Sequence, residues 1–467
     1  MELTFWGAAR TVTGSGHFLK TYGRAIMLDC GLFQGSRQIA RQMNTEFPIA
    51  PASVDAILLS HAHIDHSGNI PYFVNQGFKG AIYATPATTD LTRALLRDSG
   101  HIQEKDIEFL NRKLHAKGEQ PLPPLYTLDD AERSLAQFRS VYYYRPFSVA
   151  DGALQAEFLD AGHILGSAFT RMTINENGRQ IRLLFSGDVG RKNMPILRDP
   201  DPTGEIDCLI LESTYGNRRH QPYAGAETLL CESIGRVVGR GGKIVIPAFS
   251  MERTQEIVYA LNNLWNAGKL PHVPFYVDSP LSVNITEIFR NHPECYDEEI
   301  KKVFLTDPDP FGFEGLIYVR DTQTSKSINK LREPCIIISA SGMCEAGRIL
   351  HHLANTISDA RNAVFIVGFQ AENTLGRRLV EKQPEVKILG DTYKVNAEIV
   401  VINSFSAHAD SEELREFARQ AAASGALKKI FVVHGEETAA LALQQTLTAD
   451  LPNIETVVPK RGETFQL

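Results

Sequence analysis

The stretch Ser60-His61-Ala62-His63-Ile64-Asp65-His66 holds three of the 14 histidines of this 467-residue chain. It directly follows the apolar run Val54–Leu59, which has the composition of a buried strand. Alternate residues of an extended segment point the same way, so His61 and His63 can bind one cation while Asp65 and His66 face a second. Imidazole and carboxylate suit Zn²⁺, Mn²⁺ or Fe²⁺. The alternative, a polar turn with solvated histidines, gives no reason for four candidate ligands in six residues.

Other titratable side chains also follow predicted strands, at the point where each strand ends. They are His163 after Phe158-Leu159, Asp188 after Ile181–Phe185, Glu212 after Cys208–Leu211, His408 after Ile399–Ile402, and His434 after Lys429–Val433. Proteins with parallel strands place their sites at these carboxyl ends. Taken singly, each residue also has a plain structural interpretation, as a core histidine, a turn former or an acidic loop residue. Taken together, they supply enough ligands for two metal ions.

Two metal ions about 3.5–4 Å apart stabilise both the attacking and the leaving oxygen of a displacement reaction. That chemistry suits phosphodiester hydrolysis, and it suits amide or thioester hydrolysis equally well. A leaving alkoxide also needs a proton, which His408 can donate if Glu212 orients the ring and stabilises its charge.

The rest of the chain alternates short apolar runs with helical patterns, which is typical of an α/β fold. The remaining strand candidates are Ala25–Leu28, Lys243–Ile246, Pro274–Val277, Cys335–Ile338 and Ala363–Val367. Many candidates are rich in Ile and Val and are flanked by Gly, Asp or Ser, as expected of strands buried on both faces. Two helical patterns, Asp98–Lys117 and Asp129–Phe138, enclose a Pro-rich loop.

Two stretches indicate joints between domains. Asp199-Pro200-Asp201-Pro202-Thr203-Gly204 cannot continue a helix or a central strand, and a softer break falls at Gln383–Lys394. The chain therefore divides into residues 1–203, 204–388 and 389–467.

Composition excludes several classes of protein. A hydrophobic fraction of 43% is too high for a disordered chain, and no apolar run reaches the length of about 20 residues that spans a bilayer. The six cysteines form no CxxC pair and the N-terminus has no secretory signal, so we expect a soluble, cytoplasmic protein. The net charge of −7 argues against broad coating of nucleic acid but is compatible with a nuclease whose positive charge lies at bound metals and a few arginines.

Seven motifs resemble, in order and spacing, those of the β-CASP branch of the metallo-β-lactamase-fold nucleases. Asp29, the cluster from His61 to His66, His163 and Asp188 in Ser-Gly-Asp match the four motifs of the metallo-β-lactamase fold. Glu212 in Leu-Glu-Ser-Thr-Tyr-Gly, His408 in Ser-Ala-His-Ala-Asp and His434 in Val-His-Gly-Glu match the three motifs of the branch. Pro247-Ala248-Phe249, Ser339-Ala340-Ser341-Gly342-Met343 and Gly368-Phe369-Gln370 look like its cap domain. The resemblance covers essentially the whole chain and is strongest to bacterial and archaeal homologues of the eukaryotic pre-mRNA 3′-end cleavage endonuclease.

The resemblance implies a role for each site residue. One Zn²⁺ would be held by His61, His63 and His163, a second by Asp65, His66 and His434, and Asp188 would bridge the two, with Mn²⁺ as a substitute metal. Asp29 would orient ligand histidines from behind. A bridging hydroxide would attack phosphorus with help from Asp65, and His408 paired with Glu212 would protonate the leaving oxygen.

The resemblance also implies a fold and a substrate. An αββα sandwich would be built from the first and third segments, with an α/β cap inserted between them. Members of the branch that act on RNA carry His at the last motif, so His434 points to RNA. The resemblance also implies a narrow cleft, and a strand in it would be single-stranded because a duplex is too wide. Arg253 and the loop of Ser339, Ser341 and Gly342 could bind phosphate, although an ordinary strand–loop–helix connection has the same pattern. A homodimer is compatible with the family.

Two alternatives stay open at this point. The chain could be another metallo-hydrolase of the same fold, such as a lactamase or thioesterase, or a catalytically silent RNA-binding scaffold subunit. Endonuclease and exonuclease action are likewise undecided.

Overall fold

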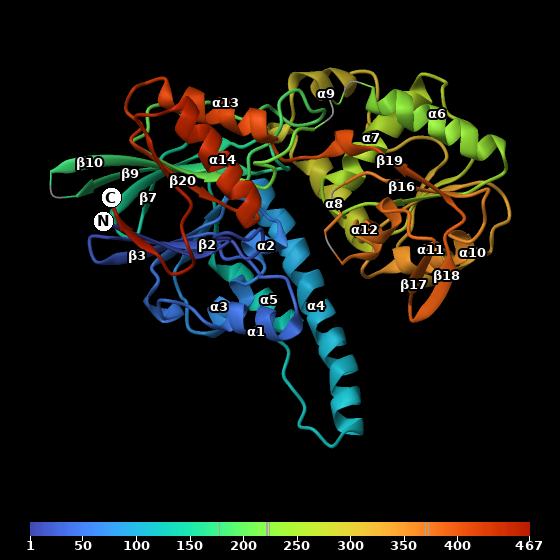
Figure 1. The fold of residues 1–467 in the computed structure, drawn as a ribbon, viewed down its shortest axis with the longest axis horizontal. Helices are drawn as coiled ribbons and strands as arrows, with labels where there is room; N and C mark the ends of the chain where they lie inside the picture. The colour runs from blue at the N-terminus through green and yellow to red at the C-terminus, as the bar shows by residue number, and fades with distance from the viewer. Residues whose placement is uncertain (177, 221–222, 224, 369, 372) are drawn as a thin grey trace. The chain divides into compact units, whose positions relative to one another are not determined.

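The computed structural model describes residues 1–176, 178–220, 223, 225–368, 370–371 and 373–467 (Figure 1). Phe369 of the Gly-Phe-Gln motif lies outside the described residues. The chain forms two compact units. The first unit comprises Met1–Asn193, Asp199–Arg219 and His408–Leu467, and the second comprises Met194–Arg198 and His220–Ala407.

The first sheet of the first unit has seven strands. Their order is β22 (Thr464–Gln466), β1 (Glu2–Gly7), β2 (Gly16–Thr21), β3 (Arg24–Leu28), β4 (Ala56–Leu58), β5 (Ala81–Ala84) and β6 (Phe138–Ser140). The strands from β22 to β3 pair antiparallel, and those from β3 to β6 pair parallel. The His61 cluster therefore follows β4, a central strand whose carboxyl end points the same way as those of β3 and β5.

The second sheet of this unit also has seven strands. Their order is β21 (Glu455–Val457), β20 (Lys429–Val433), β11 (Cys208–Glu212), β10 (Arg179–Phe185), β9 (Ala168–Glu176), β8 (Leu154–Asp160) and β7 (Phe147–Val149). The pairs β21–β20, β20–β11 and β11–β10 are parallel, so their carboxyl ends meet at one edge of this sheet. Glu212 is the last residue of β11 at this edge, and Asp188 and His434 follow β10 and β20. The strands from β10 to β7 are antiparallel.

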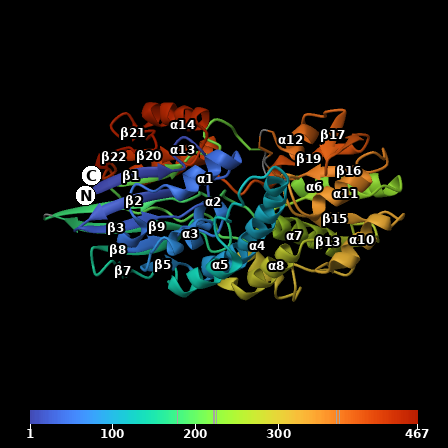
Figure 2. The ribbon, with the colours of Figure 1, turned by 90° about the horizontal axis from the view of Figure 1, so that it is seen from below.

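Apolar side chains of both sheets meet in one buried core, in which Phe5, Leu28 and Leu58 of the first sheet join Phe185 and Ile210 of the second. Helices cover the two outer faces (Figures 1 and 2). The first sheet is covered by α3 (Ile70–Asn75), α4 (Pro86–Ala116) and α5 (Leu128–Ser134), and the second by α13 (Ser411–Ala422) and α14 (Glu437–Asp450). The short helices α1 (Arg37–Thr45) and α2 (Ile64–Ser67) complete the unit. This is the expected αββα sandwich.

The second unit is an α/β domain on a six-stranded parallel sheet. The strand order is β14 (Leu316–Tyr318), β13 (Phe275–Val277), β15 (Ile336–Ser339), β12 (Ile244–Pro247), β16 (Ala363–Ile366) and β19 (Glu398–Val401). Its helices are α6 (Ala226–Gly239), α7 (Arg253–Asn266), α8 (Pro280–Asn291), α9 (Glu298–Val303), α10 (Thr322–Lys330), α11 (Arg348–Thr356) and α12 (Leu375–Val380). The fold class predicted from the sequence, a metallo-β-lactamase sandwich with an inserted α/β cap, is confirmed.

The second predicted joint has a definite structure. Gln383–Lys394 contains the hairpin of β17 (Glu385–Ile388) and β18 (Asp391–Lys394), and Val386 and Ile388 are buried in the core of the second unit. Because β19 adds a further strand to the same sheet, this unit continues to Ala407. The domain ranges 1–203, 204–388 and 389–467 stay predictions. Among the described residues, no helix is both long and apolar enough to cross a bilayer.

Two loops that carry site residues touch at Gly190. A Cβ atom at this position would lie 1.9 Å from the carbonyl oxygen of Gly162 and 2.6 Å from the backbone nitrogen of His163. We expect Gly190→Ala to lower the free energy of unfolding of the first unit by about 1–3 kcal/mol, because backbone atoms cannot yield as a flexible side chain does. Denaturant unfolding followed by circular dichroism measures this. The control is Gly239→Ala, whose added Cβ would meet nothing within 4 Å; equal stability of the two variants would contradict the expectation.

Candidate metal centre and active site

The His61 cluster is held in place by the loop that follows β3. Backbone nitrogens of Cys30 and Leu32 donate to the carbonyl oxygens of His66 and Ile64, at 2.8 and 2.9 Å. His63 is the N-cap of α2, so Asp65 and His66 lie in the single turn that follows it. The two segments pack backbone against backbone, because a Cβ at Gly31 would lie 1.6 Å from the carbonyl oxygen of Asp65.

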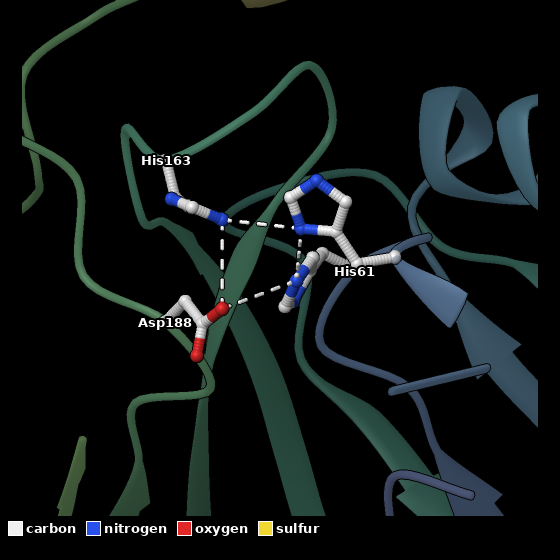
Figure 3. Close-up of side chains that lie close together, drawn as sticks. His61, His163 and Asp188 are labelled. Atoms are coloured by element: carbon white, nitrogen blue, oxygen red, sulfur yellow. Dashed lines mark hydrogen bonds and ion pairs between the residues drawn. The ribbon is translucent and has the colours of Figure 1, made fainter. Parts of the chain in front are cut away.

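A first group of donor atoms is formed by His61, His63, His163 and Asp188, whose candidate ligand atoms all lie within 4.8 Å of one another. His63 Nδ1 lies 3.0 Å from His61 Nε2 and 3.3 Å from His163 Nε2. Asp188 Oδ2 lies 3.5 Å from Nε2 of both His61 and His163 (Figure 3). Three imidazole nitrogens and a carboxylate oxygen that converge in this way form a donor set suited to a zinc-like cation.

A second group is formed by Asp65, His66 and His434. His434 Nε2 lies 3.0 Å from His66 Nε2 and 3.6 Å from Asp65 Oδ2. Asp188 also reaches this group, because its Oδ2 lies 3.4 Å from His66 Nε2 and its Oδ1 lies 3.2 Å from His434 Nδ1. Asp188 is therefore in contact with both groups. The structure brings together all seven residues that the sequence nominates as metal ligands.

Burial and charge set the protonation of these groups. Burial holds the pKa of His61 well below its usual value and lowers that of His63 to about 4, so both are neutral and offer a lone pair. Burial also disfavours a charge on His66, but the carboxylates of Asp188 and Asp29 hold its pKa well above the usual value. Burial would raise the pKa of Asp188, yet the surrounding histidines, led by His434, hold it well below the ordinary range. The neutral nitrogens of His61 and His63, beside the ionised carboxylate of Asp188, form a donor set that fits a metal-binding centre.

Asp29 fixes the position of the ligand loop by accepting hydrogen bonds from His66 and Ser60. Its Oδ2 accepts a hydrogen bond from His66 Nδ1 at 2.6 Å, while its Oδ1 accepts from the backbone nitrogen of Ser60 at 2.8 Å. The hydroxyls of Ser60 and Ser15 also donate to Oδ2, at 3.0 and 3.1 Å. Since Nδ1 of His66 is occupied by Asp29, its Nε2 is turned toward His434 and Asp188.

His408 lies beside the first group and is oriented by Glu212. Glu212 is fully buried, and its Oε1 lies 3.2 Å from His408 Nδ1 and accepts from the backbone nitrogen of Val189 at 2.7 Å. The His408 ring packs on that of His163, with centroids 4.4 Å apart. Burial alone would lower the pKa of His408, but Glu212 and Asp188 raise it to about 9. His408 is therefore a protonated imidazole at neutral pH, placed next to the metal-ligand cluster.

The structure adds residues that sequence reasoning missed. Ser15 and Ser60 bind Asp29, and the ring of Tyr215 meets the ring of His408 edge-on, with centroids 5.9 Å apart. His17, which belongs to none of the motifs in the sequence, is fully buried, and its ring packs against those of Phe5 and Phe185. The alternating pattern of β2, in which Leu19 also faces the inter-sheet core, was the available signal for His17.

The residues predicted to bind substrate lie in the second unit, at the carboxyl ends of the neighbouring strands β12 and β15. Arg253 is the first residue of α7, and Ser339 is the last of β15. The Ser339 hydroxyl donates to the carbonyl oxygen of Asp278 at 2.9 Å. The Ser341 hydroxyl accepts from the backbone nitrogens of Glu345 and Ala346. Both hydroxyls thus shape the loop, and their role in substrate binding stays a prediction.

Asp29→Asn tests the contribution of the carboxylate behind His66. The amide keeps the volume of the side chain but removes the charge that favours the Nδ1–H form of His66, so we expect metal affinity to fall by about 10- to 100-fold. Competition with a chromogenic chelator measures the affinity. The control is Asp151→Asn, a surface position whose side chain is 82% exposed. An affinity within about twofold of the unmodified protein would show that the hydrogen bond from His66 does not tune the centre.

Comparison with known protein families gives matches to three successive segments of the chain. Sequence models of three families match: the metallo-beta-lactamase superfamily over residues 13–164, the Beta-Casp domain over residues 254–379, and the Zn-dependent metallo-hydrolase RNA specificity domain over residues 392–459. All seven candidate metal ligands except Asp188 lie within the first and third matches, and Arg253 immediately precedes the second.

Three similar proteins span most or all of this chain. A ribonuclease of Thermus thermophilus is 35% identical over 96% of both chains. An RNase J-like protein of Methanocaldococcus jannaschii is 32% identical over 98% of both chains. The cleavage and polyadenylation specificity factor subunit 3 of Dictyostelium discoideum is 28% identical over all of this chain and 57% of that protein.

A solved structure shares the fold. It is the crystal structure of a protein of unknown function from Enterococcus faecalis, which aligns with a TM-score of 0.54 and 12% identity over all of this chain and 99% of that one. At this identity the likeness concerns the fold alone. The identity to the Thermus and Methanocaldococcus proteins over nearly their full lengths, together with the three family matches, shows that this chain belongs to the β-CASP branch of the metallo-β-lactamase-fold nucleases.

Proposed function

We propose that this protein is a ribonuclease that hydrolyses phosphodiester bonds of single-stranded RNA with two bound zinc ions, and that His408 is its general acid. The observation that carries the proposal is the position of Asp188, whose carboxylate contacts both groups of candidate ligands. The ribonuclease names of similar proteins and the RNA specificity domain matched over residues 392–459 support RNA as the substrate.

In this proposal His61, His63 and His163 hold one ion, Asp65, His66 and His434 hold the other, and Asp188 binds both. Mn²⁺ would substitute for Zn²⁺ at a site of this ligand type. When bound, the ions supply positive charge for the phosphate and lower the pKa of a water molecule. Asp29 fixes the orientation of His66.

In this proposal, side chains of the protein bind the attacking water and donate a proton to the leaving oxygen. Asp65, whose side chain is 23% exposed, accepts a hydrogen bond from the attacking water and aligns it. His408 faces Glu212 through Nδ1, which leaves its Nε2 proton available for the leaving oxygen. Glu212 accepts hydrogen bonds on both carboxylate oxygens, from Val189 and Thr214, so it cannot rotate away from His408. These three residues are the proposed catalytic groups of the chain.

The substrate is held by the second unit in this proposal, through Arg253 and the loop of Ser339, Ser341 and Gly342. Arg253 is 8% exposed, and its Nε has no hydrogen-bond partner among the described residues. A buried guanidinium with an open donor suits a phosphate oxygen. A cytoplasmic location and a homodimeric state accompany this proposal as predictions from the sequence.

The first test is a time course on 5′-labelled single-stranded RNA with defined ends, in the presence of Zn²⁺ or Mn²⁺. We expect cleavage by the unmodified protein and none by Asp188→Ala, because the substitution removes the carboxylate that both ligand groups share. Internal fragments at early times indicate endonuclease action. Immediate release of labelled mononucleotide indicates attack from the 5′ end, and a descending ladder indicates attack from the 3′ end.

Two outcomes of this time course would contradict the proposal. Near-normal turnover by Asp188→Ala would exclude a mechanism that needs both metal ions. An inert unmodified protein that binds metal would favour a hydrolase acting on a small substrate, while an inert protein with less than about one tightly held metal ion per chain would favour a scaffold.

His408→Ala separates proton donation from metal binding. We expect the cleavage rate to fall by about 10²- to 10⁴-fold, the contribution of a general acid, while the metal content stays unchanged. Single-turnover kinetics and elemental analysis of the same preparation measure the two quantities. His101→Ala, an exposed histidine on α4, is the control. Loss of metal from His408→Ala would instead assign this residue to the ligand set.

A further inference from the structure

We propose that Phe249 is an aromatic platform on which one unpaired base of the RNA stacks. The inference rests on the proposed function, because it names the part of the second unit that recognises the base. Phe249 follows β12, at the carboxyl end of a parallel strand, which is where α/β sheets bind their ligands.

The exposure of Phe249 has no explanation in the packing of the unit. Its side chain is 39% exposed, whereas the other phenylalanine, tyrosine and tryptophan side chains among the described residues of the second unit are buried or half-buried. The aromatic residues around the sheet, such as Phe275, Phe289 and Phe365, are fully buried. Exposed aromatic rings are a common device by which proteins stack unpaired bases.

The ring is held rigidly, as a platform requires. The carbonyl oxygen of Phe249 accepts from both the backbone nitrogen and the hydroxyl of Thr254, at 3.3 and 2.7 Å. The ring rests on the backbone of Gly342, where a Cβ atom would lie 2.8 Å from the ring carbon Cδ2. Gly342 is itself fixed by Gln370, whose Nε2 donates to its carbonyl oxygen at 3.0 Å. The ring therefore loses little conformational freedom when a base covers it.

A cation lies on the same short segment. Arg253, four residues further along, pairs through Nη1 with the Glu256 carboxylate, while its Nε is buried and has no hydrogen-bond partner among the described residues. That Nε lies 3.8 Å from the position that a Cβ on Gly368 would occupy, so it faces the loop that follows β16. An aromatic ring and a guanidinium on one short segment match the two parts of a nucleotide, because the base stacks and the phosphate takes the charge.

This assignment makes Phe249 selective for single strands. A base within a duplex has both faces covered by its neighbours, so it cannot stack on a protein ring without being unpaired first. Every base has a π face, so the contact tolerates all sequences.

The test combines substitutions in the protein with abasic positions in the RNA, using the full chain loaded with Zn²⁺ and a cleavable oligoadenylate. We expect Phe249→Ala to raise KM by about 5- to 100-fold, the range that base–aromatic stacking gives, with kcat changed by less than about twofold. Phe249→Leu keeps an apolar side chain without the π face, so it should lose most of the same affinity. Phe249→Trp should retain the affinity, and its added fluorescence should be quenched by the RNA.

The decisive readout is the coupling between the ring and one base. Single abasic residues are placed in turn along the RNA, and at one position the abasic change should raise KM for the unmodified protein but not for Phe249→Ala. Phe109→Ala, which removes a phenylalanine that is 54% exposed on α4 of the first unit, is the matched control and should leave KM unchanged. Equal thermal stability and metal content across the variants establish that each one is folded.

Two results would overturn the inference, and they are distinguishable. If the unmodified protein cleaves RNA but Phe249→Ala has the same KM, or shows additive effects with every abasic substitution, the platform is wrong and the proposed function stands. If the unmodified protein does not cleave RNA at all, the proposed function fails and the inference fails with it.

Discussion

A buried negative charge is the constraint on which this structure depends. Asp188 is 2% exposed, and its two carboxylate oxygens lie within 3.8 Å of five histidines. An ionised carboxylate in an apolar interior costs several kcal/mol unless positive charge compensates it. The fold meets this requirement by ending strands from both sheets around one point. Histidines from four separate segments of the chain can then surround a residue that no single element could neutralise.

Close approach of backbones makes that convergence feasible. Gly31 lies against the carbonyl oxygen of Asp65, and Gly190 lies against Gly162 next to His163, in each case at distances that leave no room for a side chain. The loops that carry the ligands are thus packed directly on one another. Hydrogen bonds from Ser15, Ser60 and His66 to Asp29 connect the same loops from behind. The site is positioned by rigid main-chain contacts, which preserves ligand geometry better than contacts between flexible side chains.

The parts of the fold that could be predicted from sequence are the strands whose hydrophobic pattern matches their burial in the folded protein. Buried parallel strands such as β11 and β20 are continuous apolar runs, and the titratable residue at the end of each run, Glu212 or His434, marks the site. The edge strands β7 and β21, with three residues each, carry too little periodicity to be recognised. The sequence predicts a joint at the β17–β18 hairpin because its turn, Leu389-Gly390, and its polar outer face have the composition of a linker.

The limits of prediction at the site have a physical cause as well. Metal ligands can be recognised in a sequence by their residue type. A residue whose role is a contact with the backbone cannot be recognised in this way. Ser339 and Ser341 are predicted to bind phosphate because they lie in a loop of small residues between a strand and a helix. In the structure their hydroxyls also bond to Asp278, Glu345 and Ala346 of their own unit. The burial of His17 could not be predicted, because it depends on contacts with Phe5 and Phe185 that only the folded structure shows.

The order of the ligands along the chain has a consequence for biosynthesis. His61 and His163 belong to the first part of the sandwich, but His408 and His434 come after the whole of the second unit, and β20 must insert beside β11 before His434 can reach Asp188. Chains fold largely from the N-terminus as they emerge from the ribosome. A nascent chain therefore displays a half-assembled ligand set throughout the synthesis of the inserted unit. The metal centre is completed only when β20, in the last part of the chain, pairs with β11. A chain whose synthesis stops before this strand therefore lacks a complete centre.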